Sequence, residues 1–166
     1  MDLRVYSLGN LKKDVTEKVK VDQNIEWFSK ILTELNEAAG EEEAQMLDKT
    51  HLSFSGEIKK SKNVKFGEYV LLDGNINSLF VTQCIRSGNM MFDQIECEVK
   101  AACLARSGQK QLGLEEGDSV FLEEQEYELF FFDKNQVDLE PVLHEFVFLN
   151  KNPYPTTAAM DDGPLQ

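Results

Sequence analysis

The chain has 166 residues, 42% of them hydrophobic and 28% charged, with a formal net charge of −13. This length and composition suit one globular domain with its own core and exclude a disordered chain. The acidic excess disfavours non-specific binding to nucleic acid or anionic membranes, and no apolar run approaches the ~18 residues of a membrane helix. Because the first residues also lack a basic segment followed by an apolar one, we expect a cytoplasmic protein that binds no membrane.

The negative charge is unevenly distributed along the chain. Residues 1–66 contain 12 acidic and 11 basic side chains, whereas residues 67–166 contain 18 acidic and 6 basic ones. This division predicts two surfaces with different partners, of which the acidic one would attract cations or a basic protein. An acidic surface that serves only solubility explains the same counts.

Three cysteines, Cys84, Cys97 and Cys103, show no paired pattern. An odd number without close spacing is typical of a reducing compartment and not of a disulfide framework. In a regular strand Cys97 and Cys103 would share a face about 20 Å apart, which is too far for one metal ion. We expect all three to be small, semi-buried hydrophobic residues, and we expect no bound metal or cofactor.

The first half of the chain predicts two short strands and a helix. Residues 3–8 and 17–22 alternate between apolar and polar side chains, as strands do. Residues 25–39 instead carry apolar side chains at helical spacing, with Asn24 as the expected N-cap and Gly40 as the expected end. The acidic run at 41–43 predicts a solvated loop or a helix extension.

A meander of antiparallel strands should follow. Apolar side chains alternate along 52–58, continue at 69–72, and reach Asp73-Gly74, a strong signal for a tight hairpin turn. We expect the next strand at 76–82, a turn at 87–89, and a long strand from 91 to about 102.

The remaining segments predict a strand and a second helix. Residues 127–132 are apolar enough for a central strand, and Asp138 is a suitable N-cap for a helix over 139–149. We expect a single domain over 1–155 with a disordered tail at 156–166. The predicted fold class is α+β, a mainly antiparallel sheet with two packed helices at about 25–39 and 139–149.

Two parts of the chain carry short motifs in a recognisable order. The segment 74–83 begins at Gly74 and leads to Cys84-Ile85-Arg86-Ser87, and later come Asp138-Leu139, His144-Glu145 and Pro153. These residues resemble the YceD family, the large ribosomal RNA subunit accumulation proteins. In that family a strand that starts at a glycine runs into a Cys-x-Arg-Cys turn. Here Ser87 stands in place of the second cysteine, which removes a paired-thiolate zinc site.

The resemblance implies a bacterial factor for 23S ribosomal RNA accumulation and large ribosomal subunit assembly. Its expected partners are precursor large-subunit RNA, the pre-50S particle or a basic ribosomal protein. No small-molecule substrate is evident from the sequence. The positions that match the family motifs are Gly74, Cys84, Arg86, Asp138, Leu139 and Glu145.

Basic residues provide the candidate contacts with RNA. Arg86 sits in a predicted turn, where its guanidinium could bind phosphate or stack on a base. A lysine cluster could contact phosphate, and Phe54 and Phe66 nearby could stack on bases. The cluster consists of Lys59, Lys60, Lys62 and Lys65. The alternatives are an exposed turn arginine without a partner and a solvated edge strand protected by lysines.

A thiol-dependent enzyme that uses Cys84 and His144 is the rival hypothesis. The sequence shows no glycine-rich phosphate loop, no metal-ligand spacing and no nucleophile elbow that would support catalysis. His144 is expected on a helix surface, and Glu145 is expected to anchor a backbone group or an arginine. We therefore expect a protein that is not an enzyme. An acidic interaction module unrelated to ribosomes remains a further alternative.

Overall fold

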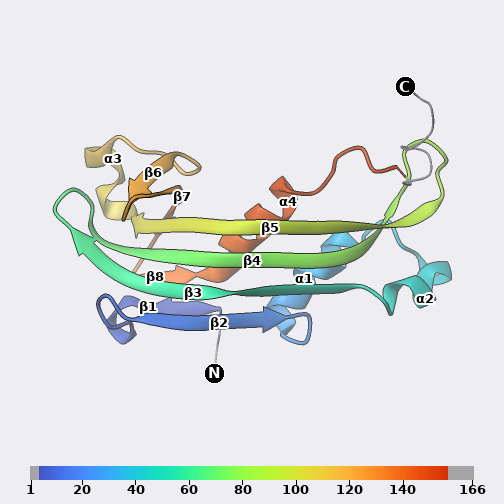
Figure 1. Cartoon of the computed structure of the whole chain (residues 1–166), viewed down its shortest axis with the longest axis horizontal. Helices are drawn as coiled ribbons and strands as arrows, with labels where there is room; N and C mark the ends of the chain where they lie inside the picture. Colours follow the sequence, from blue (N-terminus) through green and yellow to red (C-terminus); the bar gives the residue numbers. More distant parts are fainter. Residues whose placement is uncertain (1–3, 157–166) are drawn as a thin grey trace.

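Three long antiparallel strands set the length of the molecule. The computed structural model describes residues 4–156. They form a six-stranded sheet of order β2-β3-β4-β5-β7-β6 and a separate pair, β1-β8. The longest strands lie side by side and curve together along the whole molecule (Figure 1); they are β3 (His51–Asn63), β4 (Gly67–Gln83) and β5 (Met90–Ala105). The expected α+β fold class is confirmed.

Shorter elements surround these strands. The other strands are β1 (Val5–Ser7), β2 (Thr16–Asp22), β6 (Ser119–Leu122), β7 (Gln125–Phe132) and β8 (Gln136–Asp138). The α-helices are α1 (Glu26–Leu35), α2 (Ala44–Leu47), α3 (Gln109–Leu112) and α4 (Leu139–Leu149), and the 3₁₀ helices are η1 (Leu8–Asn10), η2 (Glu41–Glu43) and η3 (Arg106–Gly108). Within 4–156, no helix is both long enough and apolar enough to span a bilayer.

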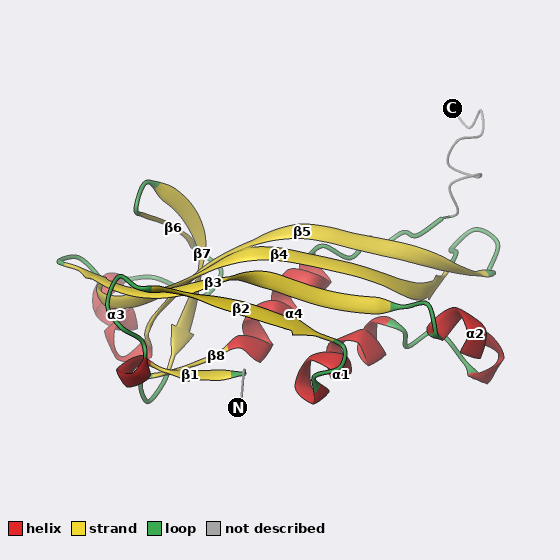
Figure 2. Ribbon diagram, turned by 60° about the horizontal axis from the view of Figure 1, so that its bottom comes forward, coloured by secondary structure: helices red, strands yellow, loops and turns green. Residues whose placement is uncertain are grey.

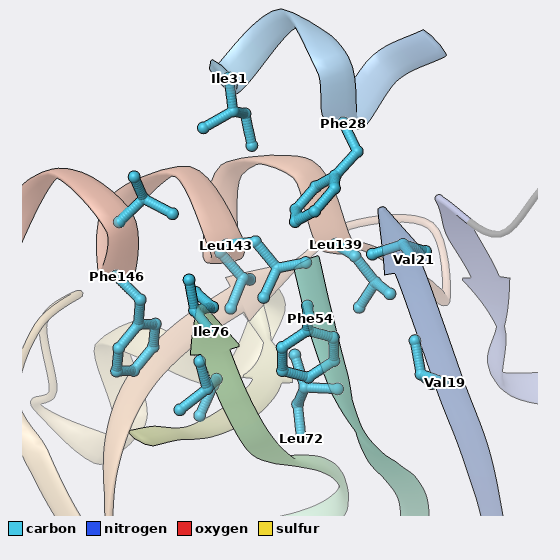
Figure 3. Packing of buried hydrophobic residues seen from close by; sticks show 14 of the residues in the cluster. Val19, Val21, Phe28, Ile31, Phe54, Leu72, Ile76, Leu139, Leu143 and Phe146 are labelled. Carbon is cyan, nitrogen blue, oxygen red and sulfur yellow. The ribbon is translucent and has the colours of Figure 1, made fainter. Parts of the chain in front are cut away.

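The main core lies between one face of the sheet and the helices α1 and α4 (Figure 2). Alternate strand residues point to this face and meet apolar side chains of both helices, as expected for a sheet with one buried face. Phe54 of β3 lies near the centre of this packing, with Leu143 of α4 and Phe28 of α1 around it (Figure 3), and each of the three is 0% exposed. Burial of three such side chains contributes several kcal/mol.

A second, smaller core lies on the opposite face at one end of the sheet. There the β6–β7 hairpin folds over β4 and β5 and rises on the side away from the helices (Figure 2). Its buried residues are Tyr69, Leu71, Ala102, Leu104, Val120, Leu122, Tyr127 and Leu129. The rest of this face carries polar side chains of the long strands, so the sheet is covered on both sides only at this end.

The hairpin turn predicted at Asp73-Gly74 is wrong. β4 runs without interruption from Gly67 to Gln83 and pairs with β3 along its first thirteen residues. Gly74 instead lies directly opposite Gly56 of β3. A Cβ atom on Gly56 would lie 2.1 Å from the carbonyl oxygen of Asp73, and one on Gly74 would lie 2.5 Å from that of Ser55. The glycine is therefore required for close backbone approach and not for a turn.

The first helix is shorter than predicted at both ends. Ile25, and not Asn24, is its N-cap, and the helix ends at Leu35 instead of continuing to 39. Asn36 ends it, because its Oδ1 accepts a hydrogen bond of 2.7 Å from the backbone N–H of Val81, and its Nδ2 donates one of 3.3 Å to Thr50. Gly40 precedes η2, and its N–H donates to Glu43.

The second helix matches its prediction. α4 spans Leu139–Leu149, and Asp138 caps it by accepting a hydrogen bond of 3.0 Å from the N–H of Glu140. The strand expected at 127–132 exists as β7, which lies between β5 and the edge strand β6 and pairs in parallel with β5, so it is internal to the sheet but not at its middle. Residues 157–166 of the predicted tail lie outside the described residues.

Candidate partner-binding surfaces

Arg86 lies in the turn that joins β4 to β5. The turn is closed by hydrogen bonds from the N–H of Cys84 to the carbonyl oxygen of Asn89, 2.8 Å, and from the N–H of Gly88 to that of Cys84, 2.9 Å. Gly88 has φ +75°, a conformation that favours glycine. The prediction of a turn at 87–89 is thus confirmed. Arg86 is exposed, and its guanidinium has no ion pair or hydrogen bond among the described residues.

The four lysines of the predicted cluster do not form one surface. Lys59 and Lys60 are neighbours in β3, so they point to opposite faces of the sheet. Lys59 forms an ion pair with Glu123 of the β6–β7 turn. Lys60 donates a hydrogen bond of 2.8 Å to the carbonyl oxygen of Leu8 and lies 3.8 Å from Glu68.

Lys62 and Lys65 are the exposed members of the cluster. Both lie at the β3–β4 turn, where Lys65 packs over the ring of Phe66, with its Nζ 5.0 Å from the ring centroid. The same turn holds Gly67 with φ +71°. The ammonium groups of these two lysines are therefore accessible, whereas those of Lys59 and Lys60 are engaged within the protein.

Arg86 and the lysines lie at opposite ends of the molecule. β4 connects the two turns with 17 residues, and a strand rises about 3.3 Å per residue, so the turns are about 50 Å apart. Figure 1 shows the β3–β4 turn at one end of the sheet and the β4–β5 turn at the other. The structure does not bring the predicted basic residues together into one RNA site.

Most of the matching motif positions have structural roles. Gly74 makes room for the backbone of β3, Cys84 is 1% exposed in the turn after β4, and Leu139 is 0% exposed. Asp138 caps α4 and also accepts hydrogen bonds of 3.0 and 2.9 Å from Arg4, which ties the beginning of the chain to this helix. Arg86 differs from these positions because its side chain supports no part of the fold.

Glu145 meets another carboxyl group, which the sequence did not reveal. It comes from α4 and forms a hydrogen bond with Glu128 of β7, on the helix-facing side of the sheet. A hydrogen bond between two carboxyl groups requires a proton on one of them. Burial, followed by the hydrogen bond to Glu145 and the charge of Glu145, raises the pKa of Glu128 to about 7. The partner of Glu145 is thus the carboxyl group of Glu128, whereas the sequence predicted an arginine or a backbone group.

Cys84 and His144 have separate surroundings. The Nε2 atom of His144 lies 3.1 and 3.2 Å from the two carboxylate oxygens of Glu34 on α1, and its ring packs on Phe148 with 4.5 Å between centroids. Cys84 is buried where the backbone of Ile85 bonds to that of Pro155. A sequence pattern could not reveal the contact between His144 and Glu34, because it joins residues 110 positions apart.

The other two thiols are poorly suited to chemistry. Cys97 and Cys103 share the helix-facing side of β5, as predicted from their spacing. Burial raises the pKa of Cys97, and burial together with the charge of Glu116 raises the pKa of Cys103 to about 12. Such thiols stay protonated at neutral pH and are weak nucleophiles and weak metal ligands. Within residues 4–156, no three His, Cys, Asp or Glu side chains gather closely enough to hold a metal ion.

An open cavity of about 690 Å³ lies beside the first turn of α4. Two cationic side chains line it: Lys134 is exposed, and Arg106 is engaged with Asp133 at 3.1 Å and with Glu116 at 4.0 Å, and packs over Phe131. Cys103 lies in its wall as a buried, protonated thiol. The guanidinium of Arg106 and the thiol of Cys103 are thus not available to a small-molecule ligand.

No match was found between this chain and any known protein family, curated protein or solved structure. The similarity of the short motifs to the YceD family therefore stays a prediction.

Proposed function

We propose that this protein is a non-enzymatic factor for 23S ribosomal RNA accumulation and large ribosomal subunit assembly, and that it acts mainly by binding a basic ribosomal protein. The process follows from the motif resemblance. The choice of partner follows from the arrangement of charges in the structure. A cytoplasmic location and the absence of a cofactor belong to the same proposal.

The observation that carries the choice of partner is the separation of the basic residues. A single RNA site would need Arg86 and the lysines within reach of one another, but the length of β4 keeps them about 50 Å apart. Lys59 and Lys60 are moreover held by Glu123 and by the Leu8 carbonyl. Because RNA affinity depends on the number of phosphates neutralised together, these residues support weak contacts only.

Acidic side chains, in contrast, remain available on the second part of the chain. Glu96, Glu98, Glu124 and Glu126 are exposed, and none of them has an ion pair within the described part of the chain. Such groups attract a basic protein and speed its association. Glu123 and Glu128 do not belong to this set, since Glu123 binds Lys59 and Tyr69 and Glu128 pairs with Glu145.

Co-purification with pre-50S particles tests the proposal. The wild-type protein should sediment with these particles. A variant with Glu96, Glu98, Glu124 and Glu126 all replaced by glutamine should be recovered in much smaller amounts, and Arg86→Ala should be recovered almost normally. Lys62→Ala with Lys65→Ala is the matched control at the opposite end of the sheet. Absence of the wild-type protein from these particles would contradict the proposed function.

A further inference from the structure

One edge of the large sheet is left without a neighbouring strand. β5 pairs with β4 from Met90 to Leu104, but β7 pairs with β5 only from Ala101 to Ala105. Along the rest of β5 the outer edge faces away from the sheet (Figure 1). Among the described residues, no backbone hydrogen bond joins Met90–Val99 to any strand other than β4.

Two side-chain contacts show which backbone groups point outward. Alternate residues of an antiparallel strand direct their N–H and C=O groups to opposite sides. The N–H of Val81 points away from β5, because it donates to Asn36. Residues paired across an antiparallel ladder point their backbone groups either toward each other or both away, so the N–H and C=O groups of its β5 partner Phe92 point outward. The β4–β5 register continues without a bulge, so the backbone N–H and C=O groups of Gln94, Glu96 and Glu98 also point outward. The hydrogen bond of Gln94 supports this assignment, since its N–H donates to Asp93 Oδ1 at 2.8 Å and not to β4.

An extended peptide can therefore add to this edge as a further strand. The N–H and C=O groups of Glu96 and Glu98 offer hydrogen bonds in the spacing that an incoming strand requires. The adjacent edge-facing group of Gln94 is already capped by Asp93, which limits how far the added strand can extend. On the helix side, Cys97 packs against the carbonyl of Phe146 in α4, which holds this part of β5 in place.

The charges along the edge determine what kind of peptide fits. The carboxylates of Glu96 and Glu98 are exposed on the open face of the sheet and unpaired within residues 4–156. Asp93 is not part of this acidic row, because strand alternation places it on the helix-facing side of β5. Lysine or arginine at alternate positions of an added strand would lie opposite these groups, where unlike charges attract.

A second copy of this chain is a poorer occupant. Antiparallel pairing of two β5 edges would place Glu96 and Glu98 of one copy against those of the other, which is unfavourable. The outer edge of β2 carries Lys18 and Lys20, but two chains of net charge −13 repel each other before this edge could dock. Acidic side chains on an exposed edge are also a common means of preventing self-association.

We propose that the edge of β5 from Asp93 to Val99 binds an extended basic segment of a partner protein by strand addition. This inference rests on the proposed function for the identity of the partner, but its geometry stands independently of it. An unstructured tail of a basic ribosomal protein has the required chemistry.

A short peptide probe tests the edge directly. The probe is an acetylated and amidated heptapeptide of alternating lysine and valine, and its binding to the full chain is measured by calorimetry. Glu96→Pro should weaken binding at least about tenfold, because proline removes an outward N–H and blocks pairing. Lys20→Pro, at an outward position of the opposite edge strand, is the matched control and should bind normally. Equal binding by Glu96→Pro and wild type would overturn the proposal.

Amide hydrogen exchange on the wild-type protein keeps the test valid if the proline variant does not fold. With the peptide, the amides of Glu96 and Glu98 should become protected, whereas those of Lys18 and Lys20 on β2 should not change. The fully N-methylated peptide and a peptide with glutamate in place of lysine should protect neither. Peptide-dependent protection of other amides would overturn the proposed site. Protection of Glu96 and Glu98 without peptide, in a sample that sediments as oligomers, would show that a second copy of the chain and not a basic peptide occupies the edge.

The outcome separates this inference from the proposed function. If the peptide binds the edge but the wild-type protein is absent from pre-50S particles, the proposed function fails and the edge site stands. If the protein sediments with the particles and Glu96→Pro does so equally well, the edge site fails and the proposed function stands.

Discussion

Gly56 and Gly74 face each other across β3 and β4, and neither position has room for a side chain. The ring of Phe54 occupies the space beside both, with its atoms 2.8 and 2.7 Å from where the two Cβ atoms would lie. Phe54 is fully buried in the main core. The glycine pair thus lets the sheet and its central aromatic side chain pack closely.

Replacement of Gly74 by alanine should therefore be strongly destabilising. The added methyl group meets backbone atoms that cannot move without disturbing the β3–β4 ladder, so we expect a loss of at least about 3 kcal/mol in the free energy of unfolding. Urea denaturation followed by circular dichroism measures it. Gly9→Ala is the control, because the nearest atom to its Cβ is 3.8 Å away. A Gly74→Ala protein as stable as this control would contradict the close contact.

The glycine pair also shows where local sequence rules fail. Asp73-Gly74 is a strong turn signal, but the same residues serve equally well where two backbones approach closely, and only the partner strand decides between these uses. The N-cap Asp138 and the face of α4 were predictable because they depend on residues within one or two helical turns. The Glu128–Glu145 pair and the Asn36–Val81 contact join distant elements, so no local pattern indicated them.

The candidate site was predictable to a similar extent. The turn that carries Arg86 was found from Ser87-Gly88-Asn89, whose glycine adopts the expected positive φ. The lysines near 59–65 looked like one cluster because they are close in sequence. Alternation in β3 places Lys59 and Lys60 on opposite faces, and Glu123 of a strand turn 64 residues away binds one of them.

The Glu128–Glu145 pair should make stability depend on pH. The pKa of Glu128 is raised from the ordinary value of 4.5 to about 7, so the folded state holds a proton that the unfolded state releases. The stability that this pair contributes is complete below pH 4.5, decreases as pH rises, and is lost above about pH 7. Urea denaturation between pH 5 and 8 should show this decrease.

Glu145→Gln is the informative variant for this pair. The glutamine amide can donate to Glu128 without a shared proton, so the decrease in stability between pH 5 and 8 should become smaller. Glu37→Gln, which changes an exposed carboxyl group, is the control and should retain the wild-type pH profile. A profile unchanged by Glu145→Gln would show that contact with Glu145 does not raise the pKa of Glu128.

Asp138 should contribute to stability through two kinds of contact. It caps α4 and binds Arg4, whose side chain also lies 3.2 Å from Glu140. Asp138→Ala removes both contacts and should cost about 1–2 kcal/mol, with most of the loss from the cap, since partly exposed ion pairs contribute little. Asp138→Asn keeps the cap and should cost less. Thermal unfolding of both variants and the wild-type protein measures the two losses. Equal losses in the two variants would assign the effect to the ion pair.

Cys84 should be dispensable for the cellular function. It is 1% exposed, so Cys84→Ser buries a hydroxyl group and should lower stability by about 1–3 kcal/mol without abolishing the proposed role in large-subunit assembly. Growth of a complemented deletion strain and its 50S profile measure the effect. Cys84→Ala, which retains an apolar side chain, is the control. A loss of function in both variants without a loss of folding would support the thiol-dependent enzyme.

Binding to naked RNA should be weak and only shallowly dependent on salt. Arg86 is about 50 Å from Lys62 and Lys65 along β4, so a short single-stranded RNA cannot engage all three, and each phosphate contact adds about 0.7–0.9 to the salt slope. Fluorescence anisotropy with a labelled oligonucleotide across a salt series measures this slope. Arg86→Ala should reduce the slope by at most one such contact, and Lys62→Ala should do so independently. A wild-type slope several times larger would indicate an RNA surface formed by other residues, and direct RNA binding would then replace the basic protein as the main interaction.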